Sequence, residues 1–167
     1  MLEDSDAEKA WLYAHEWKDY VNKYRGKNIG GFAYCWRDRM EGSNTWFGLT
    51  DYKGRRKPVY NALREQWTGK KWTTDLHNIK IISLDDGLMN GTKSFKAMVS
   101  GQKNKNLTYE WFLNKEDYLE KTGEMVISEN GEKVQVTLPE EYSKYRLYVY
   151  ASDKFGNVTT ASMPLRK

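Results

Sequence analysis

Seven short strand-like segments in the second half of the chain constrain its fold more than any other feature. Polar and apolar residues alternate in them, most clearly in residues 145–152, where Leu147 and Val149 fall on one face and Tyr148 and Tyr150 on the other. Short strands at regular spacing are typical of two antiparallel sheets packed face to face. We therefore predict a β-sandwich with strands at residues 79–84, 94–100, 107–113, 125–128, 133–138, 145–152 and 158–164.

Two turns and one tryptophan add detail to this sandwich. The NG pair at residues 130–131 and the FGN triplet at residues 155–157 contain residues that tolerate positive φ, so both predict hairpin turns. Trp111, in the segment TYEWFL, is expected to fill the core from a central strand. Cys35 is the only cysteine, so no internal disulfide can form and the fold must depend on packing.

A change in composition near Trp72 divides the chain into two units. Six of the seven tryptophans lie at or before Trp72, whereas the strand-like segments follow it. We therefore predict an α+β protein with a first unit at residues 1–72 and a β-sandwich at residues 73–167.

The first unit begins with a pattern typical of a helix N-terminus. Ser5 followed by Glu8 forms a capping box, and Gly26 stands where a helix commonly ends in a left-handed residue. The sequence therefore predicts a helix over residues 6–25. Its inner face is expected from the apolar residues that recur at helical spacing, namely Ala7, Trp11, Ala14, Val21 and Tyr24.

A strand, a loop and a second helix are predicted to follow. Residues 29–36 form an apolar run without alternation, which indicates a strand covered on both faces. After a loop rich in Gly, Ser and Asn, Pro58 is well placed in the first turn of a helix. The inner face of that helix is expected to carry Val59, Ala62, Leu63 and Trp67.

Two segments of the first unit resemble a known enzyme family. GGFAYCWRD and WFGLTDYKGRRKPVYNAL are similar to the last strand and helix of the barrels of glycoside hydrolase family 2. In the second unit, YRLYVYASDKFGNVTTASMPL resembles the last hairpin of bacterial immunoglobulin-like and PKD-type modules. These resemblances imply an incomplete β/α-barrel end, made of helix, strand, loop and helix, followed by an immunoglobulin-like β-sandwich.

The first resemblance also implies an activity and three sugar-contacting residues. Enzymes of that family cleave β-linked sugars with retention, and Trp36, at the end of the last strand, would form the floor of the sugar subsite. Asp38 is a candidate acceptor for a sugar hydroxyl, and Trp46 borders the same cleft. Each has a structural alternative: Trp36 as a core residue, Asp38 in an ion pair with Arg37 or Arg39, and Trp46 as a loop anchor.

The resemblance assigns no catalytic residue to this chain. Retaining hydrolysis needs two carboxyl groups about 5 to 5.5 Å apart. In the resembled family they lie on the fourth and seventh barrel strands, which precede the part matched here. Tyr148 and Tyr150 offer a second possible sugar platform on the sandwich, although cross-strand packing is the interpretation we favour for them.

Other site chemistries are not supported by the sequence. His15 and His77 are far apart and lack metal-ligand spacing, Cys35 is expected to be inert in an apolar segment, and no cofactor motif occurs. The basic residues around Gly54 indicate a solvated turn rather than a nucleic-acid site. No segment is typical of a membrane span or signal peptide, and the compartment is left open, although the resembled family is often secreted or periplasmic in bacteria.

The function expected from the sequence is that of a C-terminal fragment of a retaining β-glycoside hydrolase, inactive alone. The alternative is a noncatalytic carbohydrate-binding or adhesion module. Carbohydrate is the expected ligand, and the expected protein partner is the remainder of the parent barrel or a second copy of the chain. An apolar strand with two unpaired edges is not stable in water, so the first unit is expected to pack on the sandwich or on another copy.

Overall fold

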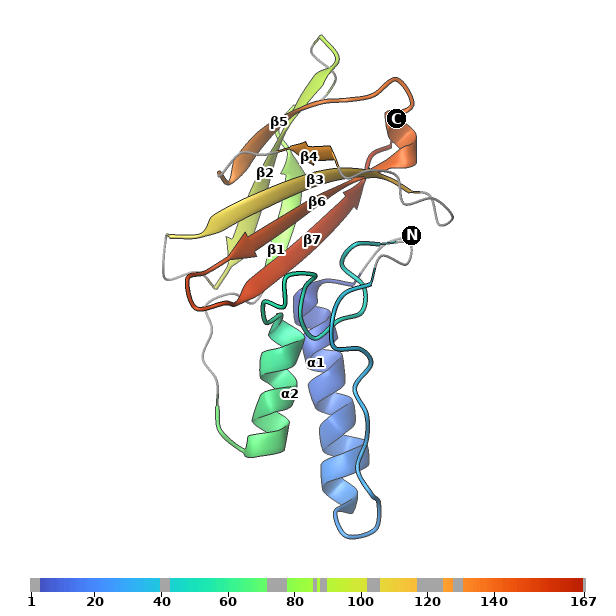
Figure 1. The fold of residues 1–167 in the computed structure, drawn as a ribbon, viewed down its shortest axis with the longest axis vertical. Coiled ribbons are helices and arrows are strands. Elements are labelled where there is room, and N and C mark those ends of the chain that lie inside the picture. Colours follow the sequence, from blue (N-terminus) through green and yellow to red (C-terminus); the bar gives the residue numbers. More distant parts are fainter. Residues whose placement is uncertain are drawn as a thin grey trace.

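The structure is a computed structural model that describes residues 4–39, 43–71, 78–85, 87, 90–101, 106–116, 125–127 and 131–166. Helices and long loops of the first unit occupy one end of the molecule, and two β-sheets occupy the other (Figure 1). The expected α+β class is confirmed. The predicted boundary at residues 72 and 73 lies outside the described residues.

Seven antiparallel strands form two sheets. The smaller sheet has the order β1-β2-β5, with β1 at Asn78–Ser83, β2 at Thr92–Ser100 and β5 at Lys133–Thr137. The larger sheet has the order β4-β3-β6-β7. Its strands are β4 at Met125–Ile127, β3 at Thr108–Lys115, β6 at Tyr145–Ser152 and β7 at Val158–Pro164. All seven strands lie where alternation and turn residues predicted them.

The two sheets enclose the main hydrophobic core. It contains Ile79, Phe95, Ala97, Trp111, Leu113, Val134, Val136, Leu147, Val149, Ala151 and Leu165. Trp111 is completely buried, and its indole Nε1 donates a hydrogen bond to the Gly131 carbonyl at 3.0 Å. The indole therefore packs in the core and also satisfies its polar atom, as a buried tryptophan requires.

One of the two predicted hairpins is confirmed. Strands β6 and β7 pair directly, and Gly156 between them has φ 79°. The other predicted turn, at residues 130–131, includes Asn130, which lies outside the described residues; the strands before and after it, β4 and β5, belong to different sheets and do not pair with each other. Turn residues indicate a change of direction but do not specify which strand the chain pairs with next.

The first predicted helix is present in three consecutive segments. Helix α1 spans Asp6–Glu16 and continues as a π-helical turn at Trp17–Val21 and a 3-10 turn at Asn22–Tyr24. The Ser5–Glu8 capping box is confirmed, because the Glu8 amide donates to Ser5 Oγ and the Glu8 carboxylate accepts from the Ser5 amide.

The inner face predicted for α1 is wrong at Trp11, which is 65% exposed and stacks on His15, and at Tyr24, which is also exposed, whereas Ala7, Ala14 and Val21 are partly buried. Ala10, Tyr13 and Trp17, which were not predicted, pack against the small core of the first unit. Two apolar stripes run along this helix, and only the position of its neighbour decides which one is buried.

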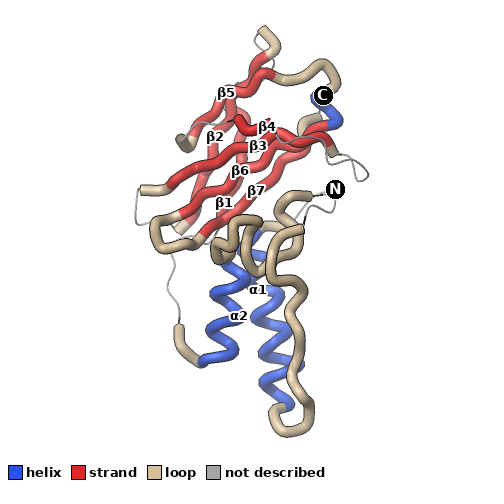
Figure 2. The backbone as a smooth tube through the Cα atoms, in the orientation of Figure 1, coloured by secondary structure: helices blue, strands red, loops and turns tan. Residues whose placement is uncertain are grey.

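The second helix, α2 at Pro58–Thr68, begins at Pro58 as predicted. It packs along α1 (Figure 2) and buries Val59 and Leu63, which with Leu49 form a small core. Asn61 is buried as well, while Trp67 is partly exposed and contacts Trp17 edge-on. The predicted inner face is therefore correct for Val59 and Leu63 and wrong at the C-terminal end of the helix.

The predicted buried strand at residues 29–36 is wrong. These residues form an irregular extended segment in which Ile29 and Phe32 are fully exposed. Every strand in the described part of the chain belongs to residues 78–164, so no neighbouring strand flanks this segment there. An apolar run becomes a buried strand only when other strands satisfy its backbone on both edges.

Candidate functional site

The candidate site is built on two loop segments of the first unit that hold each other by backbone hydrogen bonds. The Leu49 amide donates to the Cys35 carbonyl and the Thr50 amide to the Trp36 carbonyl, both at 2.9 Å. The Thr50 hydroxyl also donates to the Trp36 carbonyl, at 2.7 Å. The Asp38 amide in turn donates to the Thr50 carbonyl at 2.9 Å. Residues 35–38 are therefore fixed against residues 49–50.

Four aromatic side chains project from these loops and form what we call the aromatic surface: Tyr34, Trp36, Trp46 and Phe47. Tyr34, Trp36 and Phe47 are 55%, 59% and 43% exposed, respectively, and Trp46 is partly exposed. The ring of Phe47 lies 4.9 Å from that of Trp46 and 6.4 Å from that of Tyr34. In the described part of the chain, the ring of Trp36 comes from the same loops but contacts Tyr60 rather than these three rings. Exposed aromatic side chains commonly mark a binding surface.

Trp36, the first predicted sugar contact, lies at the surface. Its ring meets Tyr60 of α2 edge-on at 5.9 Å, which supports one edge and leaves more than half of the side chain in solvent. This exposure excludes the core-residue alternative in the present structure. Trp46 contacts Phe47, and among the described residues the rings of Trp36 and Trp46 do not touch each other.

Asp38, the second predicted contact, faces inward. Both oxygens of its carboxylate lie 3.1 Å from Lys57 Nζ, and Oδ1 also accepts a hydrogen bond from the Gly48 amide at 2.8 Å. The structural alternative of an ion pair is therefore observed, but the partner is Lys57 and neither Arg37 nor Arg39. Burial raises the pKa of Asp38 to about 6, although the Lys57 ammonium and the Gly48 amide act in the opposite direction.

Lys57 lies at the centre of a buried charged cluster, which we define as Asp6, Asp38 and Lys57. Its ammonium is fully buried, donates to the Thr45 carbonyl at 2.9 Å and lies 3.6 Å from Asp6 Oδ1. Asp6 Oδ2 accepts the amide of Thr160 at 2.6 Å and its hydroxyl at 3.0 Å. The cluster thus links helix α1, the aromatic loops and strand β7.

The solvated turn predicted around Gly54 is correct for the half-exposed Lys53 and wrong for Lys57, which is fully buried. Lys53 and Arg55 pair with Glu110 of strand β3, and Arg55 also binds Asp51 at 2.7 Å. Although burial would raise the pKa of Glu110, the hydrogen bonds from Lys53 and Arg55 lower it. The basic turn therefore attaches the first unit to the larger sheet.

Backbone pairing extends this attachment along the edge of the sheet. The Arg56 amide donates to the Gly156 carbonyl and the Val158 amide to the Arg56 carbonyl, each at 2.9 Å. Arg56 also hydrogen-bonds through its guanidinium to the Phe155 carbonyl. A strand edge that would otherwise present unpaired amides is covered by the first unit.

Sequence reasoning did not find Lys57 or Asp6. Lys57 is one of the basic residues around Gly54, and Asp6 stands in the first turn of the predicted helix, where an acidic residue is ordinarily explained by the helix dipole. A lysine directly before a helix-starting proline carries no signal of burial, so only the tertiary structure identifies these residues.

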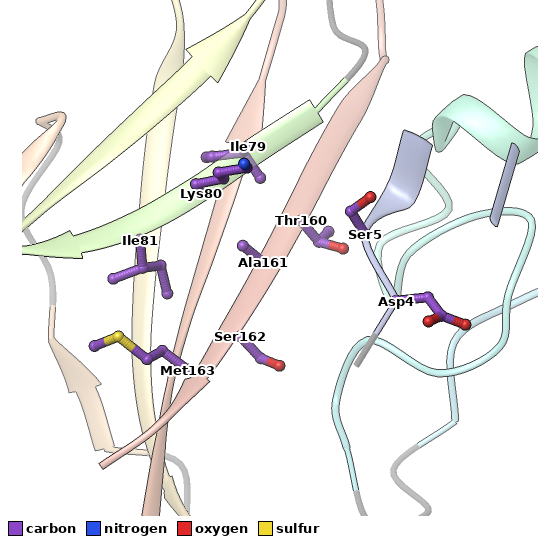
Figure 3. Close-up of a pocket in the computed structure, with 9 residues that line it drawn as sticks. All are labelled: Asp4, Ser5, Ile79, Lys80, Ile81, Thr160, Ala161, Ser162 and Met163. Carbon is purple, nitrogen blue, oxygen red and sulfur yellow. The ribbon is translucent and has the colours of Figure 1, made fainter. Parts of the chain in front are cut away.

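A hollow of about 240 Å³ lies apart from the aromatic surface, between β1, β7 and the chain before α1 (Figure 3). Its hydroxyl groups already have partners within the protein. Ser5 bonds Glu8, Thr160 bonds Asp6, and Ser162 accepts from Arg146. The charged side chains of Asp4 and Lys80 also line the hollow (Figure 3), but its hydroxyl groups are already used within the protein, and we do not take it as the candidate site.

Metal and membrane sites were also considered. Within the described ranges, no group of three or more His, Cys, Asp or Glu side chains is arranged to hold a metal ion. The helices among these residues are too short or too polar to cross a membrane.

Comparison with models of protein families, with curated proteins and with solved structures finds no match to this chain. The function of the chain must therefore be inferred from the aromatic surface and from the residues that support it.

Proposed function

We propose that this chain is the C-terminal part of a retaining β-glycoside hydrolase and that its aromatic surface contacts a glycan. The observation that carries the proposal is the exposure of Trp36 on a segment whose backbone is held by Thr50. A flat indole packs well against the apolar C–H face of a pyranose ring. A ring that is ordered before binding loses little conformational entropy when the sugar arrives.

The proposed role is substrate contact without catalysis. Three carboxylates of the first unit, those of Asp6, Asp38 and Asp51, are buried and paired with cations of the same unit. None of them is available to act as the acid/base or the nucleophile of retaining hydrolysis. We therefore expect the purified chain to leave aryl β-glycosides intact, and hydrolysis by the chain alone would contradict the proposal.

For the second unit we propose an immunoglobulin-like sandwich. Strands β1, β2 and β5 match the A, B and E strands of that fold, and β3, β6 and β7 match C, F and G. Trp111 on β3 agrees with the buried tryptophan of strand C. Strand β4 departs from the constant-type arrangement, because it pairs with β3 and leaves the smaller sheet with three strands.

A binding or adhesion module that uses the outer face of the sandwich is less well supported. Tyr148 and Tyr150, the candidate platform on that face, are both buried. The Tyr150 hydroxyl donates to the Asn44 carbonyl at 3.1 Å, and Tyr52 contacts the Tyr150 ring edge-on at 5.5 Å. The first unit thus occupies the surface that a sugar would need.

Titration with β-linked oligosaccharides tests the proposed function. Binding of β-glucan and β-galactan fragments is followed by calorimetry and by NMR of the indole N–H groups. We expect Trp36→Ala to weaken binding about fivefold or more, because one stacked ring contributes on the order of 1 kcal/mol. Trp11→Ala is the matched control, since Trp11 is 65% exposed on α1 and lies outside the aromatic surface.

Two outcomes would count against this function. The first is the absence of binding to any β-linked oligosaccharide at millimolar concentration. The second is an equal effect of Trp36→Ala and Trp11→Ala, which would show that binding does not depend on the aromatic surface.

The side chains of Ile29 and Phe32 are exposed, and we propose that they bind a protein partner. The proposed partner is the remaining barrel of the parent enzyme. Without that partner, the chain is expected to self-associate through these residues, because both are fully exposed to water. Light scattering during size-exclusion chromatography measures this, and a double change of Ile29 and Phe32 to Ser should give a monomer. A monomeric unmodified chain at high concentration would contradict the expectation.

A further inference from the structure

The buried charged cluster contains more negative than positive charge. One ammonium, that of Lys57, lies between the carboxylates of Asp6 and Asp38, and all three side chains are almost completely excluded from solvent. A buried charge without a partner is costly, and two carboxylates that share a site favour uptake of one proton.

The hydrogen bonds around the two carboxylates differ, and this difference indicates which one takes the proton. Asp6 Oδ2 accepts from the Thr160 amide, the Thr160 hydroxyl and the Thr159 hydroxyl. Asp38 accepts a single backbone amide, that of Gly48, in addition to its contacts with Lys57. Hydrogen-bond donors favour the charged form of a carboxylate, and Oδ2 of Asp6 has more uncharged donors than Asp38 has. Within the described residues, Asp6 Oδ1 accepts no hydrogen bond and faces only the Lys57 ammonium, at 3.6 Å.

We propose that Asp6, Asp38 and Lys57 form a proton-accepting positioning cluster that holds the aromatic surface most firmly in mildly acidic solution. Asp38 takes up the proton, and Lys57 then forms a matched pair with Asp6. The cluster acts on the site through the backbone: Asp38 binds the Gly48 amide next to Phe47, and Lys57 binds the Thr45 carbonyl next to Trp46.

Other charged and titratable groups around Asp38 come from each element packed against it. Helix α1 contributes Asp6, Lys9, which donates to the Thr45 carbonyl at 3.5 Å, and Tyr13, whose pKa is raised by burial. The start of α2 contributes Lys57, and strand β6 contributes Tyr150, whose pKa burial raises well above its ordinary value. Both tyrosines remain neutral in the acidic range, so their hydroxyls do not titrate with the cluster.

The sign of the pH effect follows from the raised pKa of Asp38. Its pKa in the fold is about 6, against an ordinary value of 3.8. The folded state therefore binds the proton more tightly than the unfolded chain does. The resulting stability is fully present below about pH 4 and is lost as the pH rises through about 6.

Urea unfolding at pH 5 and pH 7.5 tests the proposal with Asp38→Asn, which imitates the protonated, neutral side chain. Between these pH values, the folding equilibrium constant of the unmodified protein should fall about tenfold relative to that of Asp38→Asn. Glu132→Gln provides the baseline, because it removes one carboxylate at a distant surface position. An equal difference between the unmodified protein and Asp38→Asn at both pH values would overturn the proposal.

A measurement on the unmodified protein keeps the test independent of the variant's folding. NMR titration of the ¹³C-labelled aspartate carboxyl groups should show Asp38 titrating near pH 6, and a midpoint below about 4 would overturn the proposal.

The link between this cluster and sugar contact rests on the proposed function, and the two can fail separately. If Asp38 titrates as expected but no β-linked oligosaccharide binds at pH 5 or pH 7.5, the cluster stands and the glycan role fails. If sugar binds equally well at both pH values while Asp38 does not titrate between them, the glycan role stands and the cluster proposal fails.

Discussion

The sandwich and the first unit are stabilised in different ways. Within the described residues, eleven buried apolar residues form the sandwich core, whereas the core of the first unit consists of three buried residues, Leu49, Val59 and Leu63, with five partly buried apolar residues packed against them. Buried ion pairs and backbone hydrogen bonds also stabilise the first unit, and they attach it to strands β3 and β7. Apolar packing between the sheets therefore provides most of the sandwich's core, while the first unit depends on a few charged residues in defined positions.

The largest effect is expected from Trp111→Ala, which would break the sandwich. The indole is fully buried, so its removal should cost about 3 to 5 kcal/mol in the free energy of unfolding. Urea denaturation measures this. Trp11→Ala, at an exposed position, should change stability by less than about 0.5 kcal/mol. A loss below about 1 kcal/mol for Trp111→Ala would mean that the core is not where the structure places it.

Lys57→Met should act on the first unit alone. The change leaves Asp38 and Asp6 buried without a cation, and breaking a buried pair in this way costs about 3 kcal/mol or more. We expect the helices to unfold at a lower urea concentration than the sandwich, which hydrogen exchange resolves by segment. Loss of both units in one step would show that the sandwich also depends on Lys57.

Gly48→Ala would sharpen the comparison by disturbing only the aromatic loops. A Cβ at this position would overlap backbone atoms of Arg37, Asp38 and Thr50, which cannot move aside as a flexible side chain can. Overpacking of this kind costs about 1 to 3 kcal/mol. Gly87→Ala is the control because its Cβ would meet no atom. Differential scanning calorimetry that finds the two variants equally stable would contradict the observed loop pairing.

Ser5→Ala should have the smallest effect. It removes the hydroxyl that caps the Glu8 amide, and the loss of such a cap costs about 1 kcal/mol. Hydrogen exchange at the start of α1 should increase while exchange in the sandwich strands stays the same. Faster exchange in β7 would instead mean that Ser5 helps to place Asp6 against Thr160.

Prediction from the sequence succeeded where the deciding forces are local or where the core is complete. The capping box, the proline start of α2 and the period-two strands all follow from the residues themselves or from one closed core. The prediction of a buried strand at residues 29–36 was wrong for the opposite reason. Their apolar pattern is typical of burial, but the described structure contains no neighbouring strands to cover them.

The candidate site was predictable only in part. Trp36 was proposed from its position near the end of an apolar run; the structure shows that it is exposed, and its contact with sugar stays a prediction. The partners of Asp38 were not predictable, because Lys57, Gly48 and Asp6 reach it from three separate places in the chain. No local sequence pattern predicts that these residues contact one another.

By itself, the amino-acid sequence determined the seven strands, the first residues of both helices and the concentration of tryptophan in the first unit. Only the tertiary structure decided which stripe of α1 is buried, how the strands divide between two sheets and which charges pair. The physical reason is the distance along the sequence over which each interaction acts. Capping, turn geometry and alternation involve residues only a few positions apart, whereas burial and ion pairing depend on which residues, distant in sequence, pack against each other in the folded chain.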